Sequence, residues 1–224
     1  MTQALLFDFN GVLVDDEEQH FESLRAVLED EGIALPRETY WSDYLGFDDR
    51  MSFIAAFQRA GRPLPAPRLG HLIDAKSRAY DRLIDASLTL VPGAAEFVAR
   101  AAGRFRLGVV SGALRREIEH VLGHAGLRTH FEVIVAAEDV TSCKPDPQGY
   151  RAAHAALQPG GAVPAARCVV IEDSLPGLTA ARGAGMACVM LATSHPSEAL
   201  DGADLVWQSF VGHDPEELER LLGS

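Results

Sequence analysis

Short apolar runs recur along the chain, and they are separated by stretches in which apolar residues recur every three or four positions. The first run, residues 4–9, is apolar at every position except its aspartate, a pattern typical of a strand buried on both faces. Five further runs follow, at residues 106–112, 131–137, 167–173, 186–191 and, more weakly, 204–207. These runs predict the strands of a parallel sheet.

Stretches with helical periodicity lie between these runs. They span residues 91–102, where Pro92 is expected in the first turn, and residues 113–126, 147–157 and 174–185. The alternation of strand and helix predicts an α/β fold. We expect a Rossmann-like parallel sheet with right-handed crossovers and with helices on both faces.

Residues 16–87 interrupt this alternation, because they contain no convincing strand. Instead, three amphipathic helices are expected there, at residues 17–32, 48–61 and 66–86, with glycine and proline residues between them. The sequence therefore predicts two domains. One is a core made of residues 1–15 and 88–224, and the other is an inserted α-helical domain made of residues 16–87.

Composition narrows the class of protein. The chain has 224 residues, 47% of them apolar, and a formal net charge of −12, which disfavours binding to nucleic acid or to an anionic membrane. No segment approaches the roughly 20 apolar residues of a membrane span, and no secretory signal is evident at the N-terminus. Three widely spaced cysteines indicate reduced thiols. We therefore expect a cytoplasmic protein whose oligomeric state the sequence does not reveal.

Polar side chains stand where the predicted strands end. Because ligands of open α/β sheets bind beyond the carboxyl ends of the strands, these residues are expected to form one site. Carboxylates there would offer hard oxygen ligands to a cation, whereas a hydroxyl, backbone N–H groups and an ammonium would bind a phosphoryl group. The residues concerned are Asp8, Asn10, Ser111, Gly112, Lys144, Glu172 and Asp173.

Four short motifs around these positions give the chain a recognisable pattern. They are DFNGV at residues 8–12, VVSG at 109–112, KPDP at 144–147 and IEDS at 171–174. In this order and at strand ends, they resemble the motifs of the haloacid dehalogenase superfamily. The similarity is to the subgroup that carries a helical cap after the first motif, which includes phosphatases and β-phosphoglucomutase-like enzymes.

The resemblance implies a role for each residue at the strand ends. Asp8 would attack phosphorus and form an aspartyl phosphate. Mg²⁺ would be held by Asp8, by the backbone carbonyl of Asn10 and by Asp173. Glu172 would support these ligands of the metal site without binding the ion directly. Ser111, Gly112 and Lys144 would hold the phosphoryl oxygens.

Asn10 departs from the family pattern, in which the residue two positions beyond the nucleophile is a second aspartate that acts as general acid and base. An amide cannot move protons in this way, and losing a positioned acid or base typically costs about 10²- to 10⁴-fold in rate. Three readings stay open. In the first, another group, with Asp15 and Asp16 as candidates, replaces the missing acid and base, or the substrate has a leaving group that needs no acid. In the second, Asn10 is an engineered substitution that traps the bound ligand. In the third, the protein binds its ligand without turnover.

The helical insert supplies candidates for substrate recognition. Gly46 would let the backbone approach a ligand and Arg50 would pair with a second anionic group as the cap closes, although a helix C-cap followed by a solvated arginine explains both residues equally well. His20 and Lys76 occupy places that resemble those of a polar pair in the β-phosphoglucomutase-like group. As isolated residues on helices, they are otherwise expected to be surface groups.

The leading hypothesis is therefore a Mg²⁺-dependent hydrolase of a small phosphate monoester, such as a phosphosugar, that acts through phospho-Asp8. Two alternatives remain. The first is a phosphosugar mutase of the β-phosphoglucomutase type, favoured by His20, Lys76 and the loop around Gly46. The second is a non-catalytic module that binds a small phosphorylated metabolite, favoured by Asn10 alone.

Overall fold

The computed structural model describes residues 3–158 and 163–222, and the chain divides into two compact units. The first unit comprises Met1–Asp15 and Thr89–Ser224, and the second comprises Asp16–Leu88. The second unit takes up the stretch in which the sequence predicts an inserted helical domain, and it includes Leu88. Each unit has its own apolar core, so each is described by itself.

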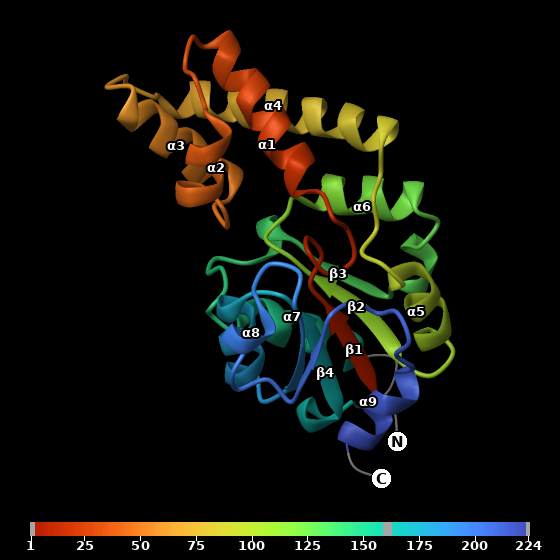
Figure 1. The fold of residues 1–224 in the computed structure, drawn as a ribbon. Helices are drawn as coiled ribbons and strands as arrows, with labels where there is room; N and C mark the ends of the chain where they lie inside the picture. Colours follow the sequence, from red (N-terminus) through yellow and green to blue (C-terminus); the bar gives the residue numbers. More distant parts are fainter. Residues whose placement is uncertain (1–2, 159–162, 223–224) are drawn as a thin grey trace. The chain divides into compact units, whose positions relative to one another are not determined.

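The described part of the first unit contains a six-stranded sheet in which every pair of neighbours is parallel (Figure 1). The order of the strands is β3-β2-β1-β4-β5-β6. This confirms the predicted α/β class, and each apolar run of the sequence contains one strand. The strands are β1 (Ala4–Phe7), β2 (Arg106–Val110), β3 (Val133–Val135), β4 (Cys168–Glu172), β5 (Ala187–Leu191) and β6 (Leu205–Trp207).

Strand β1 lies near the middle of the sheet, and its side chains pack on both faces. Ala4 and Leu6 belong to an apolar cluster with the helices α7 (Gln148–Leu157) and α8 (Leu175–Gly183). The ring of Phe7 lies 6.4 Å from that of Phe97 on helix α5 (Ala94–Ala101). All four residues of β1 are buried. Burial on both faces explains why the run is apolar throughout instead of alternating.

The helices of the first unit follow the strands largely as the periodicity predicts. One expectation is wrong in detail: Pro92 precedes the helix, because Gly93 forms its N-cap with a φ of 81°, which a non-glycine residue rarely adopts. The C-terminal helix α9 was not expected. The helices are α5 (Ala94–Ala101), α6 (Arg115–His124), α7 (Gln148–Leu157), α8 (Leu175–Gly183) and α9 (Pro215–Leu221), with 3₁₀ turns at Arg128–His130, Ala137–Asp139, Ala165–Arg167 and Ser197–Ala199.

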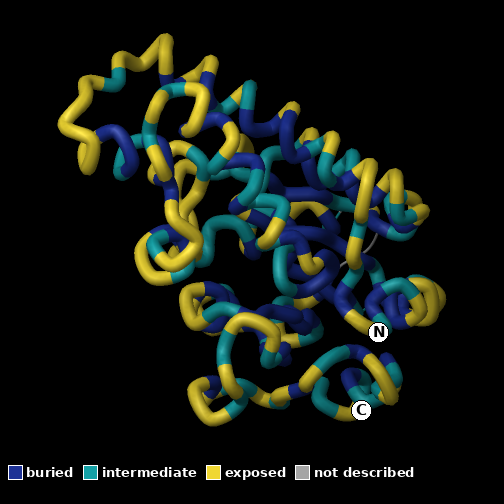
Figure 2. The backbone as a smooth tube through the Cα atoms, turned by 45° about the horizontal axis from the view of Figure 1, so that its top comes forward, coloured by how far each residue is buried: buried dark blue, intermediate teal, exposed yellow. Residues whose placement is uncertain are grey.

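Helices form the whole regular structure of the described second unit. They are α1 (Glu17–Asp30), α2 (Arg37–Asp43), α3 (Asp49–Arg59) and α4 (Ala66–Ala86). Helices α1 and α4 pack along one another. Buried and exposed positions alternate along them (Figure 2), as expected for amphipathic helices around an apolar core. The short helix α2 was not predicted, since its seven residues carry no clear apolar stripe.

Two expectations from composition can be compared with the structure. Among the described residues, none of the helices combines the length and the apolar character needed to cross a lipid bilayer. The three cysteines are free thiols, with Cys168 and Cys188 buried and Cys143 exposed.

Candidate active site

The carboxyl ends of β1 and β4 meet at the point where the strand order reverses direction. In sheets of this topology that point opens the crevice in which ligands bind. Asp8 is the first residue after β1, and its backbone N–H donates to the carbonyl of Ile171 in β4 at 2.9 Å. Glu172 ends β4 and Asp173 follows it. The pairing of the two strands therefore brings three carboxylates to one place.

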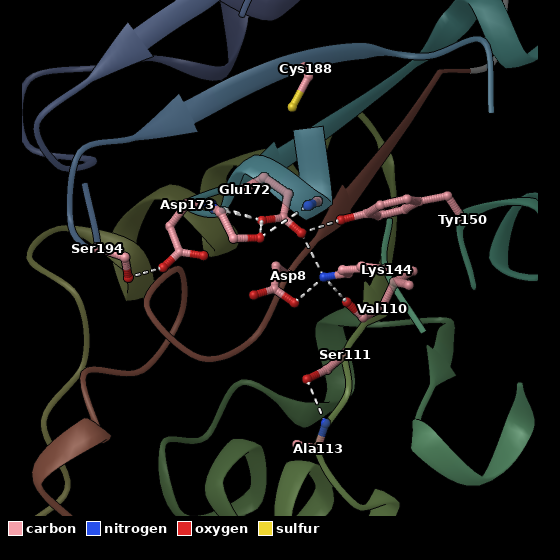
Figure 3. Close-up of polar contacts among 12 residues, drawn as sticks. Asp8, Val110, Ser111, Ala113, Lys144, Tyr150, Glu172, Asp173, Cys188 and Ser194 are labelled. Atoms are coloured by element: carbon pink, nitrogen blue, oxygen red, sulfur yellow. Dashed lines mark hydrogen bonds and ion pairs between the residues drawn. The ribbon is translucent and has the colours of Figure 1, made fainter. Parts of the chain in front are cut away.

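These three carboxylates form a tight, buried group. One oxygen from each of Asp8, Glu172 and Asp173 lies within 4.8 Å of the others. Lys144 joins the group from the loop that precedes α7, and its Nζ donates to Asp8 Oδ1 at 2.5 Å and to Glu172 Oε1 at 2.6 Å. The same ammonium donates to the carbonyl of Val110 at 3.2 Å. Figure 3 shows the amino group of Lys144 between the two carboxylates.

Glu172 is the most firmly held of the three carboxylates. Oε1 also accepts a hydrogen bond from the hydroxyl of Tyr150 at 2.8 Å. Oε2 accepts from the backbone N–H of Asp173 and of Ser174, both at 3.0 Å, and from the Ser174 hydroxyl at 2.9 Å. Both oxygens of Glu172 are therefore engaged by protein donors, whereas Asp8 and Asp173 make fewer such contacts.

The electrostatics of the group reflect this division. Burial raises the pKa of Asp8 to about 7, with the charge of Glu172 adding to the rise and Lys144 opposing it. Burial, together with the charges of Asp8 and Glu172, raises the pKa of Asp173 to about 8. Burial also acts to raise the pKa of Glu172, but Lys144 and the surrounding hydrogen bonds outweigh it and lower that pKa. Although burial disfavours a charged lysine, the two carboxylates raise the pKa of Lys144, which stays an ammonium.

The turn after Asp8 passes directly against this group. Gly11 has a φ of 72°, and a Cβ atom placed on it would overlap the carboxylate of Asp173. Backbone hydrogen bonds close the turn, from Gly11 to Val14 and from Leu13 to Phe9, each at 2.8 Å. Asn10 lies within this turn. Hard oxygen donors, an excess of negative charge and a backbone in close contact are features that suit a small divalent cation such as Mg²⁺.

Ser111 and Gly112 follow β2, on the side of β1 opposite to β4. The Ser111 side chain is buried. The backbone N–H of Ser111 donates to the carbonyl of Val135 at 2.9 Å, and the Oγ of Ser111 accepts from the backbone N–H of Ala113 at 3.0 Å. Ser111 does not cap the helix predicted at residues 113–126, because α6 begins at Arg115. Ser111 instead closes a tight turn next to Val110, whose carbonyl binds Lys144.

The second unit contains a buried polar cluster of its own. His20 Nδ1 lies 2.7 Å from Lys76 Nζ, which also forms an ion pair with Asp49 at 2.8 Å. On its other side, His20 Nε2 lies 3.3 Å from Asp16, which also accepts a hydrogen bond from Tyr80. Burial and Lys76 act to lower the pKa of His20, but Asp16 and Asp49 outweigh them and raise it. Lys76 is buried and His20 is only partly exposed, so the expectation that both are surface groups is wrong.

The structure places Gly46 and Arg50 in the second unit as well. Gly46 has a φ of 84°, and no described atom lies within 4 Å of the place where its Cβ would be, so backbone conformation alone favours glycine. Arg50 is exposed in the first turn of α3, which Asp48 caps by accepting from the N–H of Met51 at 2.7 Å. A role of either residue in substrate binding stays a prediction.

Tyr150 and Ser194 contact the carboxylates, although neither is among the predicted site residues. Tyr150 stands at an apolar position of a predicted helix, where an aromatic residue is expected in the core, so its sequence carries no signal for the hydroxyl. Ser194 follows β5, and its hydroxyl donates to Asp173. Its position three residues after the strand predicted at residues 186–191 is the signal in the sequence that points to the same sheet edge.

Comparison with known proteins agrees with this geometry. Residues 2–185 match the haloacid dehalogenase-like hydrolase family. The validoxylamine A 7'-phosphate phosphatase of Streptomyces hygroscopicus subsp. limoneus is 33% identical, and the alignment covers 92% of this chain and 93% of the relative. The crystal structure of CbbY from Rhodobacter sphaeroides in complex with phosphate has a TM-score of 0.84 and 31% identity, with 98% of this chain and 100% of that chain covered.

A second crystal structure of the same CbbY is also similar. It is an aspartate-to-asparagine mutant in complex with xylulose-1,5-bisphosphate, and it has a TM-score of 0.81 and 33% identity over 95% of this chain and 96% of that chain. The chain therefore belongs to the haloacid dehalogenase-like hydrolase family. It is an enzyme of the phosphatase group of that family.

Proposed function

We propose that this enzyme hydrolyses a small phosphorylated sugar or polyol through a phosphoenzyme on Asp8. The observation that carries the proposal is the arrangement at the junction of β1 and β4. There Asp8 accepts a hydrogen bond from Lys144, and one carboxylate oxygen from each of Asp8, Glu172 and Asp173 lies within 4.8 Å of the others. A buried carboxylate beside a fixed ammonium suits attack on phosphorus, because the ammonium offsets negative charge in the transition state.

In the first step, a carboxylate oxygen of Asp8 forms a bond to phosphorus, and the bond between phosphorus and the leaving oxygen breaks. The leaving oxygen takes the electron pair. In the second step, water attacks the phosphorus, the bond to Asp8 breaks and inorganic phosphate is released. Lys144, bound to Asp8 and Glu172, remains an ammonium through both steps, while Ser111 and the N–H groups of the following turn bind phosphoryl oxygens.

Mg²⁺ would be held by Asp8, Asp173 and the backbone carbonyl of Asn10. When bound, it would supply positive charge that offsets the phosphoryl oxygens and would favour the ionised form of both aspartates. Glu172 would keep Lys144 and the backbone of Asp173 in place, because its oxygens are occupied by Lys144, Tyr150 and the Ser174 region. The crowding of three carboxylates around one ammonium supports this assignment.

Asn10 decides how far the reaction goes in this chain. It has no proton to give to the leaving oxygen and cannot accept one from water. Asp15 is exposed and Asp16 is bound to His20 and Tyr80 within the second unit. These two carboxylates remain the first candidates to replace the missing acid and base. A substrate whose leaving group is stable as an anion would need no acid in the first step.

The relatives support the class of substrate. One is named for a phosphorylated natural product, and another was crystallised with a ketose bisphosphate while carrying an asparagine in place of an aspartate. That complex supports the view that an amide in such an enzyme leaves ligand binding intact. We therefore propose that Asn10 leaves binding nearly unchanged and slows the steps that move protons.

Rapid mixing with p-nitrophenyl phosphate and excess Mg²⁺ tests the proposal, because nitrophenol needs no general acid to leave. A burst of about one equivalent of nitrophenol followed by very slow release means that Asp8 works and that the second step lacks its base. Steady turnover means that another group supplies the base, and Asp15→Asn and Asp16→Asn then identify it. No release, with EDTA-sensitive binding of phosphate, would instead establish the non-catalytic binding module.

The Asn10→Asp variant completes the test. If the site is otherwise intact, the variant should turn over about 10²- to 10⁴-fold faster than the unaltered protein. The mutase alternative predicts a sugar bisphosphate intermediate and transfer of the phosphoryl group between two hydroxyls of the substrate. Release of free phosphate alone, by either protein, would count against that alternative.

A further inference from the structure

The segment that follows β5 brings two hydroxyl groups to the site at the end of β4. The Oγ of Ser194 donates to Asp173 Oδ2, and Oγ1 of Thr193 donates to the carbonyl of Gly11 at 2.7 Å. Figure 3 shows the contact between Ser194 and Asp173 on the side of Asp173 away from Glu172. Two adjacent residues thus contact both a carboxylate of the group and the turn that carries Asn10.

The fold explains how this segment reaches the site. Strands β4 and β5 are neighbours, with Glu172 paired to Met190, so the chain that leaves β5 passes the residue that follows β4. The segment is also tied to the sheet at its start, since the N–H of Ala192 donates to Trp207 in β6 at 2.8 Å. The two hydroxyls are therefore presented by an anchored backbone.

Close packing around Asp173 restricts the direction in which its carboxylate can point. A Cβ atom on Gly11 would overlap the carboxylate of Asp173 and would lie 3.2 Å from the Oγ of Ser194. The turn, the carboxylate and the hydroxyl therefore meet at one point. A carboxylate with one oxygen bound by a neighbouring donor has a fixed rotation, so its other oxygen is presented in one direction.

We propose that Thr193 and Ser194 are positioning residues that prepare the site for its cation. Ser194 fixes the rotation of the Asp173 carboxylate, and Thr193 fixes the backbone of the turn around Asn10 through Gly11. This inference rests on the proposed function, in which Asp173 and the carbonyl of Asn10 hold Mg²⁺. Removing a residue that hydrogen-bonds to a metal ligand and orients it typically weakens metal binding by about 10- to 100-fold.

Binding of Mg²⁺ to the full chain measures this contribution without relying on activity. We expect Ser194→Ala to weaken Mg²⁺ binding by about 10- to 100-fold in calorimetric titration, and Thr193→Val to weaken it by a smaller factor. The matched control is Ser197→Ala, because Ser197 lies on the same segment but accepts a hydrogen bond from Gln208, outside the site. Ser194→Thr, which keeps a hydroxyl at the position, should restore most of the affinity.

A kinetic readout separates positioning from a general loss of structure. In the burst of nitrophenol release from p-nitrophenyl phosphate, Ser194→Ala should raise the Mg²⁺ concentration for half-saturation, while the burst rate at saturating Mg²⁺ stays near that of the unaltered protein. Equal Mg²⁺ affinities of Ser194→Ala, Ser197→Ala and the unaltered protein would overturn the inference and leave the proposed function standing. If the unaltered protein itself binds no Mg²⁺, both the inference and the proposed metal site are overturned.

Discussion

Each of the two units buries a cluster of charged side chains, and the clusters differ in their balance of charge. In the described part of the first unit, the carboxylates of Asp8, Glu172 and Asp173 lie together, and one ammonium, that of Lys144, pairs with the first two. In the second unit, two carboxylates flank two basic groups in a chain of contacts that runs Asp16, His20, Lys76, Asp49. The first cluster carries surplus negative charge, whereas the second is close to neutral when His20 is protonated.

Because of this difference, the first cluster favours binding of a cation, whereas the charges of the second cluster compensate one another. Burial and the neighbouring carboxylates raise the pKa of Asp8 to about 7 and that of Asp173 to about 8, so Lys144 compensates their ionised forms only in part. A bound cation would supply the remaining compensation. In the second unit each charge has an opposite charge beside it, which stabilises a folded helical unit. Removing one charged group should therefore have opposite effects on the stability of the two clusters.

The largest expected effect comes from Asp8→Asn, which removes a surplus charge from the first cluster with almost no change in shape. Without the proposed nucleophile the enzyme should lose at least about 10⁴-fold in phosphoryl transfer, measured as the nitrophenol burst. The melting temperature in EDTA should stay the same or rise, since crowding of carboxylates is relieved. Asp201→Asn, at an exposed position of the same unit, is the control that should change neither quantity. A large fall in melting temperature for Asp8→Asn would contradict the assigned surplus of charge.

The next largest effect is on stability and concerns the second cluster. Lys76→Met removes the buried ammonium that bridges His20 and Asp49, and leaves a carboxylate without its partner. Breaking a buried pair in this way typically costs about 3–5 kcal/mol, which urea unfolding of the full chain would detect. Arg78→Met changes an exposed residue two positions along the same helix and should cost much less. Equal losses for the two variants would mean that the cluster is not balanced by Lys76.

The dependence of stability on pH gives a third test. In EDTA, Asp8 and Asp173 hold their protons more tightly in the folded state than in the unfolded state, where such groups titrate near pH 4. The folded protein therefore binds more protons between about pH 4 and pH 8, and its stability falls as pH rises through this window. We expect the melting temperature to drop by several degrees from pH 5 to pH 8.

Two controls assign this drop to the first cluster. His20 also has a raised pKa, so its contribution falls in the same direction as pH rises through that value. The variant Asp8→Asn should flatten the drop, and the slope that remains reports His20 and Asp173. Added Mg²⁺ should stabilise the unaltered protein more at pH 8 than at pH 5, because the cation competes with protons for the aspartates. Stabilisation by Mg²⁺ that is independent of pH would contradict the proposed ligands.

The same contrast explains how much of the molecule could be predicted from its sequence. The parallel sheet followed from continuous apolar runs, and the rule that ligands bind at the carboxyl ends of strands brought Asp8, Lys144 and Asp173 together correctly. These residues stand in loops after strands, where a polar side chain has few structural reasons to occur. Their chemistry is therefore visible in the sequence.

The second cluster could not be predicted in this way. His20, Lys76 and Asp49 lie on three amphipathic helices, and a polar residue on such a helix is normally exposed. Their burial depends on how the helices pack, and periodicity does not specify that packing. The short helix α2 could not be predicted either, since its seven residues carry no clear apolar stripe.

The smallest expected effect tests how far each carboxylate depends on a single hydroxyl. Tyr150→Phe removes the donor to Glu172, but Lys144 and Ser174 still hold that carboxylate. We expect a loss of about 1–2 kcal/mol in the free energy of unfolding, because a buried hydrogen bond to a charged group disappears while the ring stays. Activity should fall less than about tenfold, since Lys144 keeps its place. The matched variant Tyr40→Phe in the second unit removes a hydroxyl that donates to Glu17 at 2.5 Å, a carboxylate that water can still reach. It should therefore cost less, and an equal or larger loss for Tyr40→Phe would show that burial of the acceptor is not what makes the Glu172 contact valuable.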